Sequence, residues 1–347
     1  MVQQFGTDIK RRSGHHRDRQ VPCGMIRLLL SLSIITAGLM TGYCIRLVAR
    51  RYRPRADLAS LRRALQVIAL LGLNPIATFS AIWAFELDNL RIALLPALGV
   101  LTLALGGLAG ILMGRAQRLS RTQAGAYFCA SGMFNIGSIG GLLVFLFLGE
   151  AGFALVPFFR LFEEFSYYAF FFPIAKNHGD GEAGADGRSR LATIVRDPFI
   201  LVAVTSILLG FTLNLTGVSR PALFSRVNSV VIPAGSFLLL ASIGIAMEFR
   251  RIRKYLRPAM LVALTKFVFV PSVVVSAAAL LGLGRFDDGL ALKVVLILSS
   301  TPVAFLALVP PALYKLDLDL ANSAWIVTTA LLAVVVPLQM VVIRLLG

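Results

Sequence analysis

The sequence is poor in charged residues, cysteine and histidine. Charged residues make up 15% of the 347, whereas 57% are hydrophobic and the mean hydropathy is +0.81. The three cysteines have no paired spacing, which excludes a disulfide framework and a zinc site. The three histidines lie in polar segments, so no histidine relay inside a membrane is available. A P-loop is also missing, which argues against ATP as the energy source.

Long apolar runs dominate what remains. A soluble protein of this size does not need so many, and the sequence therefore predicts an all-α polytopic membrane protein. Ten runs are long enough to cross a bilayer. They cover residues 25–48, 63–85, 91–113, 123–148, 151–175, 197–215, 229–248, 256–283, 290–314 and 320–346.

One polar segment divides these runs into two sets of five. Residues 176–196 are rich in Gly, Asp and Arg and are expected to form a cytoplasmic linker loop between a first repeat at 25–175 and a second at 197–347. Residues 1–24 are polar and basic and predict a disordered tail. Five spans per repeat place the second copy upside down in the membrane, so we expect an inverted repeat.

The formal net charge of +17 lies mainly in the loops between apolar runs. This distribution favours cytoplasmic loops beside anionic lipid over a nucleic-acid surface. The loops after the first, third and seventh runs are the richest in Arg and Lys, which predicts both termini outside the cell. The basic tail conflicts with that orientation and mildly favours a start at Met25.

Two apolar runs carry residues that disfavour a continuous helix. The fourth contains GMFNIGSIGG at 132–141, and the ninth contains SSTP at 299–302. Glycines and proline interrupt helices, and two helices broken at matching places mark a transporter site near the membrane midplane. The helix N-termini beyond such breaks favour an anion. Close helix packing at Gly137 and Gly141, and an ordinary kink at Pro302, are the alternatives. The candidate substrate-binding residues are Asn135, Ile136, Gly137, Ser138, Ser300, Thr301 and Pro302.

Three charged residues lie within the fifth run. Glu163 and Glu164 follow Arg160 by three and four positions, so either can pair with it on one helix face. Charges at this depth are costly and often functional. We expect Glu163 foremost, and Glu164 with less support, to bind a coupling proton while Arg160 tunes its affinity. A purely structural ion pair is the alternative.

Other polar and small residues in the apolar runs favour structural roles. Lys266 could face an anionic substrate, but its position predicts that it reaches towards the cytoplasmic surface. Asn322 and Ser323 are expected to cap the tenth helix rather than face a substrate. A ridge for close helix packing is predicted from the spacing of Gly106, Gly110 and Gly114.

Several of these motifs resemble those of the auxin efflux carrier family, a branch of the bile acid/auxin/arsenite-type transporter superfamily that includes bacterial carriers. The fourth run, FNIGSIGG at 134–141 followed by FLGEAG at 147–152, is similar to the family's fourth span. STPVAF at 300–305 and YKLDLD at 314–319 are similar to its ninth span and following loop. Residues 42–46 and the tenth run also resemble it, so the likeness covers residues 25–347.

The resemblance implies ten spans in a 5+5 inverted repeat, with broken crossover helices in spans 4 and 9. It further implies a scaffold of spans 1, 2, 6 and 7, an elevator-type transport unit and a homodimer. The chain lacks a proline shortly after the fourth-span glycines and lacks the long cytoplasmic loop of the plant carriers. The implied substrate is therefore a malate-like or malonate-like carboxylate rather than auxin.

The sequence thus predicts a secondary transporter of small organic anions in the plasma (bacterial inner) membrane, driven by protons or by the membrane potential, without a cofactor or a metal. A sodium-coupled symporter of the bile-acid type is the alternative, and it would need oxygen ligands around the crossing. An enzyme would need a nucleophile–base pair or metal ligands at depth, which the sequence does not offer. A membrane sensor would need a soluble output domain, and residues 176–196 are too short for one.

Overall fold

The computed structural model describes residues 20–53, 57–85, 90–179, 198–247, 249, 251–285 and 287–346. Within these ranges the chain is helical, and its only β-type pairing is one isolated bridge. The first helix begins at Gln20, so the last five residues of the predicted disordered tail (1–24) are helical instead. The rest of that tail and most of the predicted linker 176–196 lie outside the described residues.

The helical segments of the first half include short π and 3-10 turns, labelled η. They are α1 (Gln20–Tyr52), α2 (Leu58–Val67), η1 (Ile68–Leu73), α3 (Asn74–Trp83), η2 (Leu90–Leu94), α4 (Leu95–Ala116), α5 (Arg121–Gly132), η3 (Ile136–Gly140), α6 (Gly141–Phe159), α7 (Glu163–Ser166), η4 (Tyr167–Phe171) and α8 (Phe172–Lys176).

The second half has a similar succession of long helices and short turns. Its segments are α10 (Pro198–Leu215), α11 (Leu223–Ala246), η5 (Ile252–Tyr255), α12 (Leu256–Leu264), η6 (Thr265–Phe269), α13 (Val270–Leu280), η7 (Leu283–Arg285), η8 (Asp287–Gly289), α14 (Leu290–Ser299), η9 (Phe305–Leu308), α15 (Val309–Leu313), α16 (Leu318–Ala330) and α17 (Leu332–Leu345).

Among the described residues, six helical stretches are long and apolar enough to cross a membrane. They are Met25–Tyr52, Leu58–Trp83, Arg91–Ala116, Ile136–Lys176, Leu223–Ala246 and Ile252–Leu280. The pair α16 and α17, bent by 48° at its junction, adds a seventh if it is counted as one span. The predicted number of spans was ten. The protein is therefore an all-helical chain with several membrane-compatible helices, and the finer ten-span arrangement stays a prediction.

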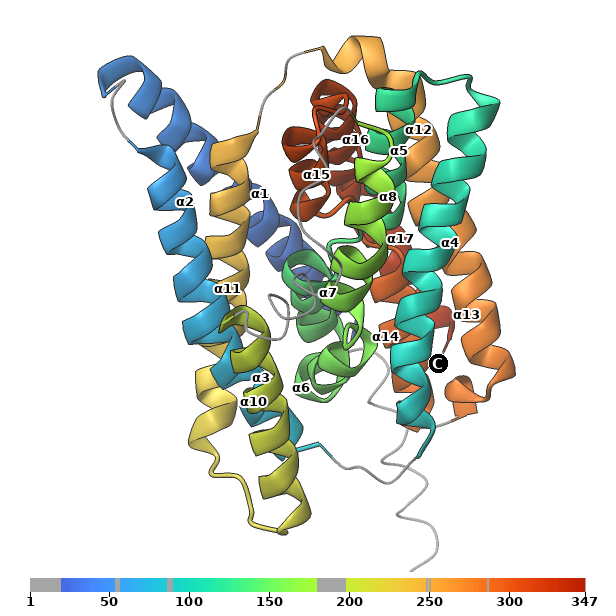
Figure 1. Ribbon diagram of the computed structural model, residues 1–347. Coiled ribbons are helices and arrows are strands. Elements are labelled where there is room, and N and C mark those ends of the chain that lie inside the picture. Colours follow the sequence, from blue (N-terminus) through green and yellow to red (C-terminus); the bar gives the residue numbers. More distant parts are fainter. Residues whose placement is uncertain are drawn as a thin grey trace, which may run out of the picture.

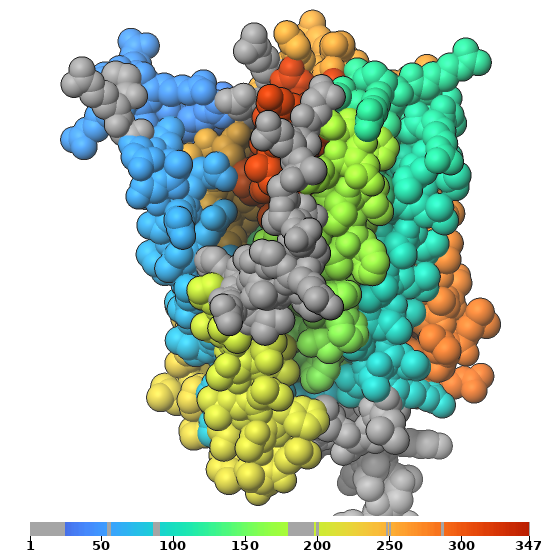
Figure 2. All heavy atoms as spheres, in the orientation of Figure 1, coloured from blue at the N-terminus to red at the C-terminus, as the bar shows by residue number. Residues whose placement is uncertain are grey.

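The helices pack in two groups (Figure 1). In one group α11 packs against α1, α2 and α3, and α10 packs against α3. The other group contains α4, α5, α6 and α12 to α17, with α4 against α5, α12 against α16 and α14 against α6. In the space-filling view, α2 and α10 form one side of the visible face, and α4 forms the opposite side (Figure 2).

In the part of the chain that the structure describes, three of the four π turns are closely followed by a proline. Pro75 follows η1, Pro173 follows η4 and Pro271 follows η6, each two residues after the turn ends. Proline has no N–H to donate, and its ring collides with the carbonyl one turn earlier. A wider turn before the proline relieves that collision, so these long helices continue past the proline without a break.

Two glycines of α4 bring α5 close enough to be fixed in place. A Cβ added to Gly106 would lie 2.6 Å from the carbonyl oxygen of Ser131, and one added to Gly110 would lie 3.0 Å from Cα of Phe128. At Gly114 the nearest atoms are 3.9 Å away. The predicted packing ridge is thus confirmed at its first two positions, where it positions the end of α5 that leads into the site.

Candidate functional site

The centre of the molecule contains a crossing of two extended segments. Helix α5 ends at Gly132 and α14 ends at Ser299, and each is followed by a few residues of non-helical backbone. Asn135 N donates to Pro302 O at 2.9 Å, and Ala304 N donates to Met133 O at 3.0 Å. These two bonds form the antiparallel bridge between Phe134 and Val303. We call Met133–Ser138 the first arm and Ser300–Ala304 the second arm.

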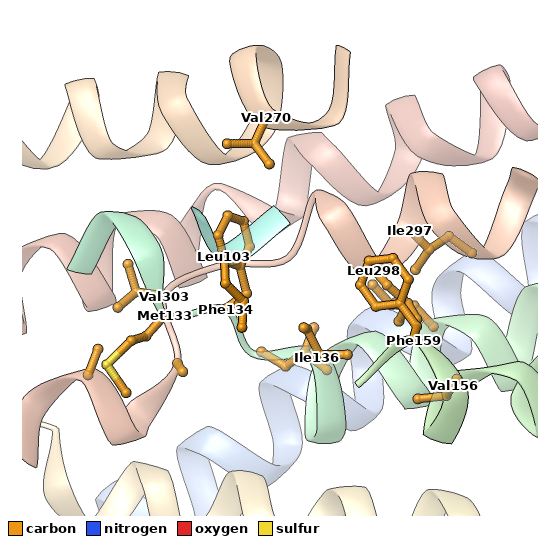
Figure 3. Packing of buried hydrophobic residues seen from close by; sticks show 14 of the residues in the cluster. Leu103, Met133, Phe134, Ile136, Val156, Phe159, Val270, Ile297, Leu298 and Val303 are labelled. Carbon is orange, nitrogen blue, oxygen red and sulfur yellow. The ribbon is translucent and has the colours of Figure 1, made fainter. Parts of the chain in front are cut away.

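Apolar side chains enclose the crossing on its inner side (Figure 3). Met133, Phe134 and Val303 are fully buried, and Leu298 of α14 and Ile136 lie beside them. Backbone groups without a helical partner are costly inside such a cluster. The bridge satisfies two N–H groups and two carbonyls at once, which explains why both segments can leave the helical conformation here.

Asn135 caps the helix that begins within the first arm. Its side-chain Oδ1 accepts from Ile139 N at 3.4 Å and from Ser138 Oγ at 2.5 Å. The helix then continues through η3 into α6, whose backbone is interrupted at Gly149 with φ 74°. The first intrahelical bond runs from Gly140 N to Asn135 O at 3.1 Å. The N–H groups of Ile136, Gly137 and Ser138 precede it and have no acceptor within the helix.

Arg160 lies against this helix start. A Cβ added to Gly137 would overlap Arg160 Nη1, so the guanidinium occupies the space that any other residue at position 137 would fill. Arg160 itself follows the last turn of α6, where a cation is favoured by the helix dipole. The structure therefore joins two predicted groups, the glycine-rich stretch and the charged residues of the fifth run.

Glu163 is buried and is held by two side chains. Its Oε2 lies 2.8 Å from Arg160 Nε, and its Oε1 accepts from the Tyr167 hydroxyl at 3.0 Å. The same hydroxyl accepts from Phe134 N at 3.1 Å and lies 3.2 Å from Phe134 O. Glu164 is more exposed and lies 3.7 Å from Arg160 Nη2. Of the two adjacent carboxylates, Glu163 is thus the one connected to the crossing.

The second arm satisfies its polar groups within the protein. Ser300 Oγ donates to Leu296 O, and Thr301 Oγ1 donates to Leu298 O at 3.2 Å. Val303 N donates to Thr328 Oγ1 at 3.2 Å. Gln339 Nε2 donates to Ser300 O at 3.2 Å and to Ser300 Oγ at 2.7 Å. The second arm therefore has few free donors to offer a ligand.

Lys266 is not where the sequence suggested. The prediction that it reaches towards the cytoplasmic surface is wrong, because its side chain is completely buried. Its Nζ donates to Met133 O at 2.9 Å and lies 3.3 Å from the centroid of the Phe134 ring. A carbonyl and an aromatic face together compensate a desolvated ammonium in part. This residue adds a buried Nζ donor to the first arm.

The predicted caps of the tenth helix are also wrong. The cap of α16 is Asp317, whose Oδ1 accepts from Leu320 N at 3.0 Å. Asn322 and Ser323 lie inside the helix, and Ser323 Oγ donates to Asp319 O at 2.7 Å. An aspartate one turn earlier is an equally good cap by sequence criteria, so the true start of the helix decided between them.

Both arms and the Arg160–Glu163 pair were predicted from the sequence, and the structure brings all of these together. It missed Tyr167 and Gln339 and misplaced Lys266. A polar residue inside an apolar run is the signal that could have identified all three, since such groups usually face protein or a cavity in a membrane. Whether the residues at the crossing bind a substrate stays a prediction.

No protein-family model matches this chain, and a search of curated proteins found no significant match. Among the residues that the structure describes, no group of three or more His, Cys, Asp and Glu side chains could hold a metal ion.

Proposed function

We propose that the protein is a secondary active transporter of small organic anions, such as malate-like or malonate-like carboxylates. The crossing is the observation that carries this proposal. It brings the first turn of a helix, with Asn135 as its cap, against the Arg160 guanidinium. These groups are hydrogen-bond donors, and a helix start also has a positive dipole end. A carboxylate suits such a point, and binding and release need no nucleophile.

A ten-span inverted repeat is part of the proposal. The stretch Ile136–Lys176 has 41 residues, about 60 Å if straight, which is twice the thickness of the hydrocarbon core. Gly149 interrupts it with φ 74°, which supports two crossings rather than one. The shorter apolar helices Leu201–Leu215 and Leu290–Ser299, the latter extended by α15, supply further spans. The antiparallel bridge lies where a two-fold axis in the membrane plane would relate two repeats.

An elevator-type movement fits the packing into two groups. Helices α1, α2, α3, α10 and α11 correspond to spans 1, 2, 6 and 7, the scaffold that the family resemblance implies. The crossing belongs to the other group, so a rigid movement of that group would carry the site across the membrane. The resemblance also implies a homodimer. Both termini are proposed to lie outside, in a bacterial inner membrane.

Proton coupling is favoured over sodium coupling. Glu163 is a buried carboxylate beside the proposed anion site, which is the arrangement expected of a proton-binding residue. A sodium ion would need oxygen ligands at the crossing. Met133 O is already bound by the Lys266 ammonium. That contact favours protons or the membrane potential as the driving force, and it disfavours the sodium-coupled alternative.

Uptake into proteoliposomes tests the proposal. Purified protein would be reconstituted, and labelled mono- and dicarboxylates would be offered with and without an inward proton gradient and a sodium gradient. We expect accumulation of a dicarboxylate that is abolished by a protonophore and insensitive to sodium. Empty liposomes and liposomes with heat-inactivated protein are the controls. Accumulation that needs sodium and ignores the proton gradient would overturn the coupling, and no uptake of any organic anion would overturn the function.

A further inference from the structure

We infer that Arg160 binds the substrate's carboxylate directly, and that the Glu163 carboxylate occupies this guanidinium only while the site is empty. The inference rests on the proposed function and specifies its mechanism. Proton uptake by Glu163 and anion binding by Arg160 would then be a single exchange, with one proton taken up for each anion bound.

The two ends of the guanidinium face different groups. Nε lies 2.8 Å from Glu163 Oε2, and Nη2 lies 3.7 Å from Glu164 Oε1. Nη1 is the nitrogen nearest to Gly137, and it makes no ion pair with the described residues. The Arg160 side chain is 29% exposed, whereas that of Glu163 is 5% exposed. The positive charge is therefore accessible, and its partner lies behind it.

A second group points to a ligand at the same place. The Asn135 side chain is 7% exposed, and its Oδ1 accepts from Ile139 N–H, which can only donate. This bond fixes the orientation of the amide, so Nδ2 is the atom left to donate. Nδ2 makes no hydrogen bond with the described residues. The side chain as a whole is more than nine-tenths buried, so this amide donor has a fixed position, and a carboxylate beside Arg160 Nη1 would provide its acceptor.

Tyr167 allows Glu163 to be satisfied in both protonation states. With Glu163 ionised, the Tyr167 O–H donates to Oε1. Once a proton from water has bound to Glu163, the carboxyl O–H can donate to the Tyr167 oxygen, and the tyrosine proton can rotate to Phe134 O, 3.2 Å away. The only covalent bond that forms is the one between this proton and the Glu163 carboxylate, and the remaining changes are hydrogen bonds. The neutral acid no longer attracts the guanidinium, which is then free for a substrate carboxylate.

Few other charges act on this exchange. Glu164, at 36% exposure, is the second carboxylate that faces Arg160. Lys266 contacts Phe134, the residue whose backbone binds the Tyr167 hydroxyl.

Malonate is the probe for the test. Binding would be measured on the purified full-length protein by equilibrium dialysis, and proton uptake by a pH indicator in weakly buffered solution, at a pH where malonate is fully ionised. For the wild type we expect uptake of about one proton per malonate bound. Glu163→Gln should bind malonate without proton uptake, with an affinity that no longer rises at acid pH. Arg160→Gln should weaken binding about 100-fold at every pH.

Two further variants guard against a folding defect. Arg160→Gln leaves Glu163 buried without its partner, so the double change Arg160→Gln/Glu163→Gln removes both charges together. It should remain monodisperse and still fail to bind malonate. Arg226→Gln removes an arginine from the exposed start of α11 and should bind as the wild type does.

The outcomes separate the inference from the proposed function. Malonate uptake by wild-type proteoliposomes together with tight binding by the double variant would overturn the inference and leave anion transport standing. Continued uptake of a proton by Glu163→Gln would also overturn it. If neither malonate nor any other carboxylate in the uptake panel were bound or transported by the wild type, the proposed function would fall, and the inference with it.

Discussion

The two arms of the crossing can be compared position by position. Their backbones are alike, since each donates one N–H to the other and each anchors another buried N–H on a side-chain oxygen. Phe134 N uses Tyr167, and Val303 N uses Thr328. Their chemistry differs. The first arm has open donors and charged neighbours, whereas the hydroxyls of the second arm donate to carbonyls of α14.

This difference shows that a symmetric backbone does not imply a symmetric site. A crossing needs two interrupted helices for its hydrogen bonds, but an anion needs only one positive pole. We therefore expect substitutions on the first arm to change binding and coupling. Substitutions on the second arm should change stability instead.

The largest difference is expected between Gly137→Ala and Gly140→Ala. The new methyl group at position 137 would overlap Arg160 Nη1, which is held in place by Glu163. At position 140 it would meet Leu298 Cδ2 at 2.8 Å and Thr301 Cγ2 at 3.0 Å, the ends of side chains that can adjust. We expect uptake to fall about 100-fold for the first and about threefold or less for the second, measured as initial rates in proteoliposomes. Equal losses would show that the overlap with Arg160 is not the cause.

Asn135→Leu should be the next most damaging change. It removes the helix cap and the amide donor while keeping the volume of the side chain. The apparent affinity for malonate should fall about 30-fold, whereas Ser300→Ala should change it about threefold or less. Asn135→Ser, which restores a cap but not the amide donor, is the matched control. Full affinity in Asn135→Ser would show that the cap, and not the donor, is what matters.

Tyr167→Phe and Thr328→Val form a closely matched pair. Each deletes the oxygen that accepts from a buried N–H group of one arm. Both should destabilise the protein by about 1–3 kcal/mol, seen as a lower midpoint of thermal unfolding in detergent. Only Tyr167→Phe should also alter the dependence of uptake on pH, because Tyr167 contacts Glu163 and Thr328 does not. A pH profile shifted by Thr328→Val would break the comparison.

Glu164→Gln should have the smallest effect. Its carboxylate is 36% exposed and lies 3.7 Å from Arg160, so solvent screens most of their attraction. Uptake should change by less than about twofold, with unchanged proton uptake on malonate binding. Loss of proton coupling in this variant, with coupling intact in Glu163→Gln, would show that Glu164 and not Glu163 binds the proton.

Much of the fold follows from local sequence. Apolar runs predict a membrane protein, and proline explains where three π turns interrupt its long helices. The interruptions at residues 132–141 and 299–302 follow from glycine and proline chemistry, which acts on the residue itself and its nearest neighbours. The pairing of Arg160 with Glu163 follows from their spacing of three residues.

The ends of elements and the fates of single polar side chains were harder to foresee. The cap of α16 was predicted at Asn322 and lies at Asp317. Both residues suit a cap, and only packing fixes where the helix begins. Lys266 was expected near the membrane surface because Arg257 is nine residues away, yet it is buried beneath Phe134. A helical wheel gives the face of a residue but not the element that covers that face.

The sequence by itself thus determined a helical membrane protein, its two interruptions and the charged residues beside the first of them. Only the tertiary structure decided that Arg160 lies against Gly137 and that Tyr167 joins Glu163 to the crossing. It also decided that the hydroxyls of Ser300 and Thr301 donate to carbonyls of α14. The physical reason is the difference in the distance along the chain over which the two effects act. Backbone preferences act over a few residues, whereas the partner of a buried polar group is chosen by the whole packing, because each donor must find the nearest acceptor that folding leaves available.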